Sequence, residues 1–210
     1  MTLALAPLMM ATVPRLRLVG EATARGADDA ALVGGALRGN RSSEEAIYRA
    51  YAPAVLTLTT RLLGRRSDGE DATQDTFILA FQNMHQLRSP AALRPWLMRI
   101  AVSQVRRRFR KRRLLRTLGL YVGADDATLE SLVSSGASAE VRTDLAALDR
   151  VLGTLPANQR IAWMLRYVEG EQLEDVAQAC GCSLATAKRR IAAADAQVHA
   201  EVRVGEIEEP

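Results

Sequence analysis

The amino-acid sequence predicts an all-α protein of two small helical domains joined by a flexible linker, the second domain with a helix-turn-helix. Ala, Leu and Arg dominate the composition, and aromatic residues make up only 4% of it, which favours helices over strands. Runs rich in Val, Ile, Thr and Tyr, the usual sign of strands, are almost absent. The 210 residues leave room for one or two domains, and an apolar share of 48% is enough for their cores.

Changes in composition divide the chain into five segments. Residues 1–27 contain several Pro and Gly residues without sustained periodicity, and we expect a disordered extension there. Residues 28–118 and 141–203 carry apolar residues at helical spacing and are predicted as the two domains. Residues 119–140 are acidic and rich in Gly and Ser, which indicates a flexible linker, and residues 204–210 form an acidic tail.

Four helices are expected in the first domain. The first covers about residues 28–38, before Gly39 and Asn40 stop it. The second opens near residue 42, and Pro53 is expected to kink or split it.

The third helix of this domain begins at Ser67 or Asp68, where a polar side chain can cap it. Residues 85–92 are expected to form a loop. The fourth helix covers residues 93–118 and has Pro95 near its first turn, where proline is tolerated.

Charge is distributed unevenly, although the formal net charge is only +4. Residues 88–116 include eleven basic residues and no acidic one, whereas residues 120–149 include six acidic residues and one basic residue. A basic block followed by an acidic stretch suggests a surface that binds a polyanion and a separate solvated connector. A solvated Arg-rich helix is the alternative interpretation of the basic block.

Residues 171–197 have the pattern of a helix-turn-helix. The small side chain of Ala177 lets the second helix approach the first, and Gly181 suits a tight turn that needs a positive φ. Ser183 lies in the N-cap position of the second helix. The apolar side chains that this second helix is expected to bury are Leu184, Ala187, Ile191 and Ala194.

The other face of that second helix is polar and basic. A helix in the major groove offers its first turns to base edges and its basic residues to phosphates. The candidate DNA contacts on this helix are Ser183, Thr186, Lys188, Arg189 and Arg190. A helical hairpin with an exposed basic face is the alternative interpretation.

Cys180 and Cys182 fall within the turn, where we expect them to pack between the two helices as apolar residues. A C-x-C pair without a nearby His or further Cys makes a poor zinc site, so we expect neither a metal nor a cofactor. Two cysteines form no disulfide framework, and this fits a cytoplasmic protein. The sequence contains no stretch of eighteen apolar residues that would span a membrane.

Three further stretches complete a recognisable order of motifs: EDATQDTF at residues 70–77, LRPWLMRIA at 93–101, and LRYVEG at 165–170 ahead of the helix-turn-helix. Together they resemble the extracytoplasmic-function (ECF) group of the bacterial sigma-70 family of RNA polymerase sigma factors. The resemblance implies that residues 28–118 are region 2, which binds core polymerase and melts the promoter −10 element. It implies that residues 141–203 are region 4, which recognises the −35 element.

The resemblance also suggests roles for single residues. The candidate polymerase contacts are Asp71, Gln74 and Asp75. The candidate contacts to the −10 element and its phosphates are Arg88, Arg94, Trp96, Arg99, Arg106, Arg107 and Arg110. Trp96 could stack on a base, but a single aromatic residue on an apolar helix face is usually part of a core. Core RNA polymerase, promoter DNA and an anti-sigma factor are the partners that the resemblance implies.

Three alternatives remain open at this point. The first is a stand-alone helix-turn-helix regulator, which would bind operators as a dimer without polymerase. The second is an enzyme, against which the two His and two Cys residues and the lack of a Gly-rich phosphate loop argue. The third is a sigma-like protein without promoter activity, because Ser103 and Arg107 stand where the family often has Asn and Asp.

Overall fold

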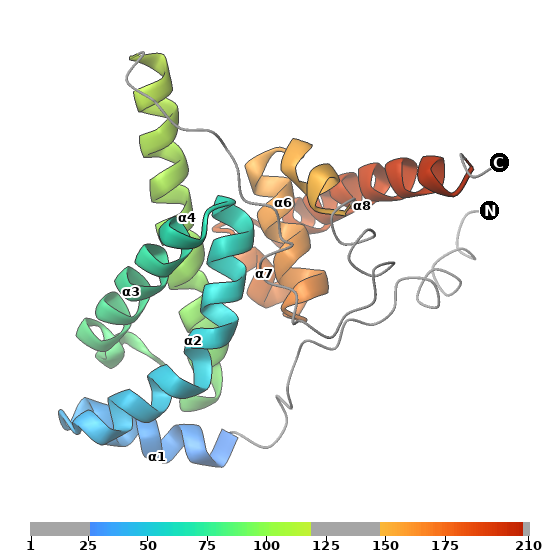
Figure 1. Cartoon of the computed structure of the whole chain (residues 1–210). Coiled ribbons are helices and arrows are strands. Elements are labelled where there is room, and N and C mark those ends of the chain that lie inside the picture. Colours follow the sequence, from blue (N-terminus) through green and yellow to red (C-terminus); the bar gives the residue numbers. More distant parts are fainter. Residues whose placement is uncertain (1–25, 119–147, 208–210) are drawn as a thin grey trace.

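The computed structural model describes residues 26–118 and 148–207, and every regular element within these ranges is helical. The all-α prediction is therefore confirmed. The first domain contains α1 (Gly26–Leu37), α2 (Arg41–Leu63), α3 (Arg66–Gln82), the short 3₁₀ turns η2 (Met84–Gln86) and η3 (Pro90–Ala92), and α4 (Leu93–Thr117). The second contains a helical stretch at residues 148–154, α6 (Ala157–Trp163), the π-helical turn η5 (Met164–Val168), α7 (Leu173–Ala179) and α8 (Leu184–Ile207). Figure 1 shows α4 of the first domain beside α7 of the second.

The start of α2 differs from the prediction. Asn40 does not simply end the preceding helix, because its side-chain oxygen accepts hydrogen bonds from the backbone N–H groups of Ser42 (2.9 Å) and Ser43 (3.4 Å). Asn40 is thus the N-cap of α2, and it satisfies two of the amides that a helix start leaves without partners. The helix starts at Arg41, directly after this cap.

Pro53 does not split α2, which runs without interruption from Arg41 to Leu63. Figure 1 shows the helix changing direction partway along its length, as expected where a proline removes a backbone donor. The hydroxyl of Thr57 donates to the carbonyl of Pro53 at 2.9 Å in the turn that follows. The expected kink is present and the expected break is not.

The first core forms where α2, α3 and α4 meet. Their apolar residues recur every three or four positions, so each helix presents one buried stripe to the other two. The large side chains that are completely buried there include Ile47, Leu58, Leu62, Leu97 and Met98. The helix α1 joins this core through a buried contact, in which the Tyr51 hydroxyl lies 2.7 and 2.8 Å from the two carboxylate oxygens of Asp29.

The second core forms between α6, α7 and α8. Val176 and Ala177 of α7 are buried, as are Ala187, Ile191 and Ala194 of α8, which confirms these parts of the prediction. Leu184 was expected to be buried and is instead 37% exposed, and it is the first residue of α8. The helix α8 also continues to Ile207, beyond the predicted end of the domain at residue 203.

Several predictions concern residues outside the described ranges. They are the disordered extension up to residue 25, the linker at residues 119–140, the start of the second domain at residues 141–147, and the last three residues of the acidic tail.

Candidate nucleic-acid interface

The turn of the helix-turn-helix has the geometry that its residues predict. Gly181 adopts a φ of 55°, in the left-handed region that glycine enters without steric cost. The backbone N–H of Thr186 donates to the Ser183 hydroxyl at 3.2 Å, so Ser183 is the N-cap of α8. The hydroxyls of Ser183 and Thr186 are 3.0 Å apart. This pair fixes where α8 begins, and therefore which residues occupy its first two turns.

The first two turns of α8 present a basic face. Lys188 and Arg189 are exposed, and their side chains lie in no ion pair within the described part of the chain. Arg190 differs, because it is half-buried and its Nη1 atom is enclosed without a hydrogen-bond partner among the described residues. Lys188 and Arg189 are accordingly the basic groups most available to a phosphate or a base edge.

The two turn cysteines lie between the helices, as expected. Cys180 is buried and Cys182 is half-buried, and both are free thiols. Burial raises the pKa of Cys180 above its ordinary value, although the nearby Arg106 works in the opposite direction. Cys180 therefore lacks the depressed pKa of a reactive cysteine.

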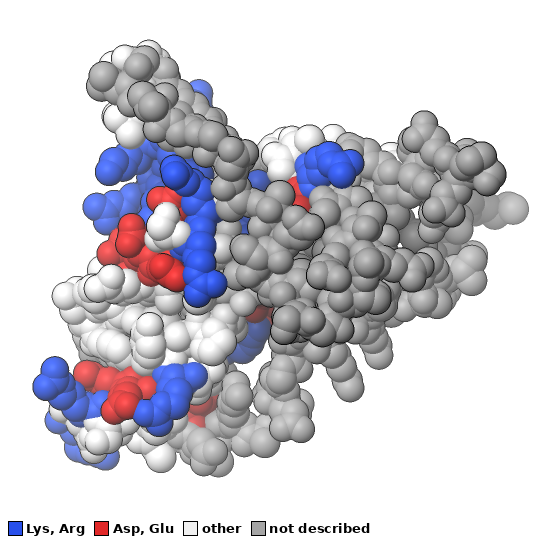
Figure 2. Space-filling model, viewed as in Figure 1, with Lys and Arg blue, Asp and Glu red and all other residues white. Residues whose placement is uncertain are grey.

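The arginines of α4 fall into two groups. Arg107 and Arg110 are exposed, whereas Arg108 forms an ion pair with Asp75 at 3.0 Å. Arg112 donates to the carboxylate of Asp68 and to the backbone carbonyl of Leu63. Figure 2 shows basic side chains gathered over the upper part of the first domain, beside an acidic cluster. Part of the basic block therefore fastens α4 to its own domain, and the rest is available to a polyanion.

A pocket of about 350 Å³ lies at the loop that precedes α4. Three of the predicted −10 residues, Arg88, Trp96 and Arg99, line it together with Gln86, Leu87 and Ala92. Trp96 is only 7% exposed, so most of its ring belongs to the core and one part of it faces the pocket. The last lining residue, Gln178, comes from α7 of the other domain.

Two further predicted −10 residues contact the second domain. The two terminal nitrogens of Arg94 lie 3.1 Å from carboxylate oxygens of Glu169 and Glu171, one nitrogen at each. Arg106 donates to the backbone carbonyl of Cys180 at 2.9 Å. The structure therefore divides the seven predicted −10 residues between a pocket, an exposed helix face and an interdomain contact.

The candidate polymerase contacts lie together on α3. Asp71 and Gln74 are exposed one turn apart, and the neighbouring Asp75 has 43% of its side chain exposed while it pairs with Arg108. Phe77, on the other face of this helix, is buried and packs edge-to-face against Tyr48 with the ring centroids 4.7 Å apart. Such a polar face over a packed core suits a partly charged protein interface.

Sequence reasoning missed Glu169 and Glu171, whose side chains are only 5% and 7% exposed. Burial raises the pKa of Glu169 to about 7, against the opposing effects of Arg94 and Arg61. The pKa of Glu171 is raised for the same reason. In the sequence, Glu169 and Glu171 on either side of Gly170 look like the acidic residues of an ordinary solvated turn. Only their contact with Arg94 in the structure shows that they belong to an interdomain cluster.

The structure offers no group of three or more His, Cys, Asp or Glu residues that could hold a metal ion within the described ranges. Among the same residues, no helix combines the length and the apolar character that a membrane span needs.

Two family models match the chain. Residues 47–114 match the model of sigma-70 region 2, and residues 145–194 match that of sigma-70 region 4. The chain is 32% identical over 142 residues to the ECF RNA polymerase sigma factor EcfG of Rhodopseudomonas palustris, covering 68% of this chain and 75% of that protein. It is 30% identical over 172 residues to the ECF sigma factor SigM of Mycobacterium tuberculosis, covering 81% and 82% of the two chains.

Two solved structures share the fold. One is the sigma factor RpoE of Bartonella quintana in complex with the anti-sigma factor NepR, with a TM-score of 0.60, 23% identity and coverage of 77% and 96% of the two chains. The other is CnrH in complex with the cytosolic domain of CnrY, with a TM-score of 0.62, 21% identity and coverage of 84% and 97%. On the two region matches and these relatives, the chain belongs to the ECF group of the sigma-70 family of RNA polymerase sigma factors.

Proposed function

We propose that this sigma factor binds core RNA polymerase and directs it to promoters with a −35 and a −10 element, and that the residues described above make these contacts. One observation carries the proposal: two helical modules that match regions 2 and 4, each with an exposed basic helix face, follow one another in a single chain. RNA synthesis belongs to the polymerase, and the sigma factor contributes recognition and no catalytic chemistry of its own.

Region 4 recognises the −35 element in this proposal. The first turns of α8 enter the major groove, where Arg189 is the strongest candidate for a guanine because a guanidinium can donate to two acceptors of one base. Ser183 and Thr186, at the helix start, are placed to contact a phosphate or a base edge. Lys188 adds a positive charge that attracts the phosphate backbone of the DNA. Arg190 supports the same face from its half-buried position.

Region 2 holds the −10 element in this proposal. A base that leaves the stack could enter the pocket beside Trp96, where Arg88 and Arg99 offer hydrogen-bond donors. Arg107 and Arg110 lie exposed on α4 and would bind the phosphates that follow. Because phosphate contacts release counterions, promoter binding should weaken steeply as the salt concentration rises.

The partners follow from the same assignment. Asp71, Gln74 and Asp75 would dock on core polymerase through the exposed face of α3. RpoE of Bartonella quintana was solved in complex with the anti-sigma factor NepR, which supports an anti-sigma factor for this chain as well. A protein with these partners would act in the cytoplasm, where the polymerase and the chromosome are.

The test is run-off transcription with purified core polymerase on a library of promoters from the source genome. The full chain should make core polymerase start RNA synthesis at a defined subset of them, whereas core alone should not. A stand-alone regulator would instead bind duplex DNA tightly without polymerase. No specific product from any promoter in the library would reject the proposal.

A further inference from the structure

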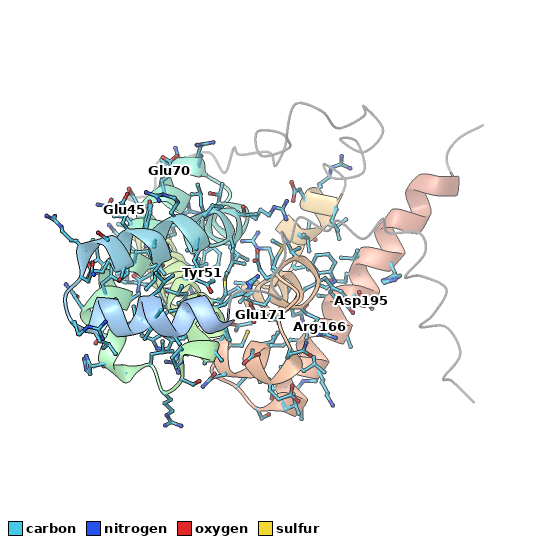
Figure 3. The ribbon with its side chains drawn as sticks, turned by 90° about the horizontal axis from the view of Figure 1, so that it is seen from below. Glu45, Tyr51, Glu70, Arg166, Glu171 and Asp195 are labelled. Carbon is cyan, nitrogen blue, oxygen red and sulfur yellow. The ribbon has the colours of Figure 1, made fainter. Side chains whose placement is uncertain are left out.

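The two domains meet around the guanidinium of Arg94, in the first turn of α4. Its Nη1 lies 3.1 Å from Glu171 Oε1, and its Nη2 lies 3.1 Å from Glu169 Oε2 and donates to the Glu169 backbone carbonyl at 2.9 Å. Arg166 donates to the backbone carbonyl of Glu171 at 2.9 Å and so fixes this turn from within region 4. Figure 3 shows Glu171 between the two domains. Three acceptors thus surround one arginine that is only 21% exposed.

The same interface extends along α4 and α2. Arg106 donates to the Cys180 carbonyl at 2.9 Å, and Arg160 of α6 donates to the Leu62 carbonyl at 2.6 Å. The Arg160 guanidinium also lies over the ring of Phe109, 5.5 Å from its centroid. These contacts join backbone and side chains of both domains on either side of the Arg94 cluster, and they favour one defined packing of region 4 on region 2.

This packing covers the face that region 2 needs for DNA. Gln178 of α7 forms one wall of the pocket that Trp96 and Arg99 line, so the helix-turn-helix lies where a flipped base and its phosphates would enter. Arg94 cannot bind a phosphate while Glu169 and Glu171 hold its two terminal nitrogens, because these nitrogens are the donors that a bidentate anion requires.

The spacing of the two elements leads to the same conclusion. Positions −35 and −10 are separated by 25 base pairs, which is about 85 Å of B-form DNA at 3.4 Å per base pair. In the structure α4 of region 2 is in direct contact with α7 of the helix-turn-helix, so the DNA-binding faces of the two domains cannot reach both elements together. The domains must separate before both can bind one promoter.

We propose that the contact of Arg94 with Glu169 and Glu171 is an autoinhibitory latch, in which two carboxylates of region 4 occupy a DNA-binding arginine of region 2 and hold the chain closed. The proposal rests on the proposed function, because it assumes that this face of region 2 binds DNA. The acids act as a substitute for phosphate oxygens, and core polymerase releases the latch when it takes the two regions apart.

The latch is tested with the full chain carrying Glu169→Ala together with Glu171→Ala, which removes the side-chain oxygens that accept from the Arg94 guanidinium. A matched control carries Glu44→Ala and Glu174→Ala, which truncates the same residue type outside any ion pair of the described chain. Binding of a fluorescein-labelled, mixed-sequence 12-nucleotide single strand is measured by anisotropy, and the radius of gyration by small-angle X-ray scattering. Circular dichroism verifies that each variant is folded.

The latch variant should bind the single strand about tenfold more tightly than the control, because apparent affinity scales with the open fraction. Its radius of gyration should also increase. A second variant, Gln178→Glu, places a carboxylate in the pocket beside Arg88 and Arg99, and it should weaken binding of the strand below the wild-type level. The two variants thus move the same equilibrium in opposite directions.

Equal radii of gyration for latch variant and control, or equal affinities for the strand, would overturn the latch. Run-off transcription by the wild-type chain separates this outcome from a failure of the proposed function. If the wild type is active and the variants behave as the control does, only the latch is rejected. If the wild type gives no promoter-specific product, the proposed function fails, while the scattering data still decide whether the carboxylates hold the domains together.

Discussion

Gly69 of α3 lies so close to Thr60 of α2 that an added β-carbon would stand 2.7 Å from the Thr60 Cα and 2.2 Å from its Oγ1. The same approach lets the Thr59 hydroxyl of α2 donate to the Gly69 carbonyl at 3.0 Å, and the Thr73 hydroxyl, one turn further along α3, donates to the same carbonyl at 2.8 Å. The hydroxyls of Thr59 and Thr73 are themselves 3.0 Å apart. Two helices of region 2 therefore contact each other backbone to backbone, with buried hydroxyls in place of large apolar side chains.

Gly69→Ala should destabilise the protein, because the new methyl group meets backbone atoms that cannot move aside. We expect a loss of about 1–3 kcal/mol in the free energy of unfolding, the usual effect of overpacking. Gly153→Ala is the matched control, since Gly153 is also helical and its added carbon would meet nothing within 4 Å. That change should stabilise by about 0.5–1 kcal/mol. Urea denaturation of both variants measures the difference, and equal midpoints would contradict the close approach.

Arg189→Ala combined with Arg190→Ala should reduce promoter use and leave polymerase binding intact. Loss of one bidentate base contact costs about 1–3 kcal/mol, so run-off product at limiting sigma factor should fall at least about fivefold. A pull-down with core polymerase reports binding separately. Arg38→Ala with Arg41→Ala removes the same charge from the junction of α1 and α2, and it should reduce the product far less. If the double change in α8 abolishes the pull-down, α8 contacts polymerase rather than DNA.

Glu169 should make stability depend on pH. Its pKa is raised from 4.5 to about 7 by burial, so the folded chain holds this proton more firmly than the unfolded chain does. The contribution of Glu169 is therefore most favourable below about pH 4.5 and is lost as the pH rises through about 7. The positive charges of Arg94 and Arg61 oppose this rise in the Glu169 pKa, whereas Glu171 adds to it. The pKa of Glu171 is itself raised by burial.

The pH effect is measured from thermal melting temperatures between pH 5 and pH 8. The wild-type melting temperature should decline towards pH 7 more steeply than that of Glu169→Gln, which lacks the titrating group. Parallel curves for the two proteins would show that Glu169 is ionised equally in the folded and unfolded chains. Gln in place of Glu174, an exposed acid of α7, should leave the wild-type slope unchanged.

Tyr51→Phe should destabilise region 2, because the Tyr51 hydroxyl hydrogen-bonds to Asp29, which is only 7% exposed. Removing one partner of a buried polar pair costs about 1–3 kcal/mol. Tyr48→Phe is the control, since Tyr48 is 46% exposed and packs through its ring on Phe77. Chemical denaturation should show a shifted midpoint for the first variant only. An unchanged midpoint for Tyr51→Phe would mean that water replaces the hydroxyl without cost.

The features that depend on short stretches of chain could be predicted. The turn at Gly181, the cap at Ser183 and the buried stripe of α8 follow from local backbone preferences and from the 3.6-residue period, which neighbouring residues determine. Asn40 was misjudged because Asn both ends one helix and caps the next, and its role depends on how closely the second helix follows. Leu184 was misjudged because periodicity says which face is apolar but not where the partner helix ends.

The sequence by itself therefore determined the helices, the helix-turn-helix and the family, since these depend on local chemistry and on the order of motifs. Only the tertiary structure decided which arginines remain available to DNA. Arg108 and Arg94 look alike in the basic block, yet one pairs with Asp75 of its own domain and the other with two buried acids of the next domain. Electrostatic attraction acts between atoms a few ångströms apart in space, and packing brings those atoms together from distant parts of the chain.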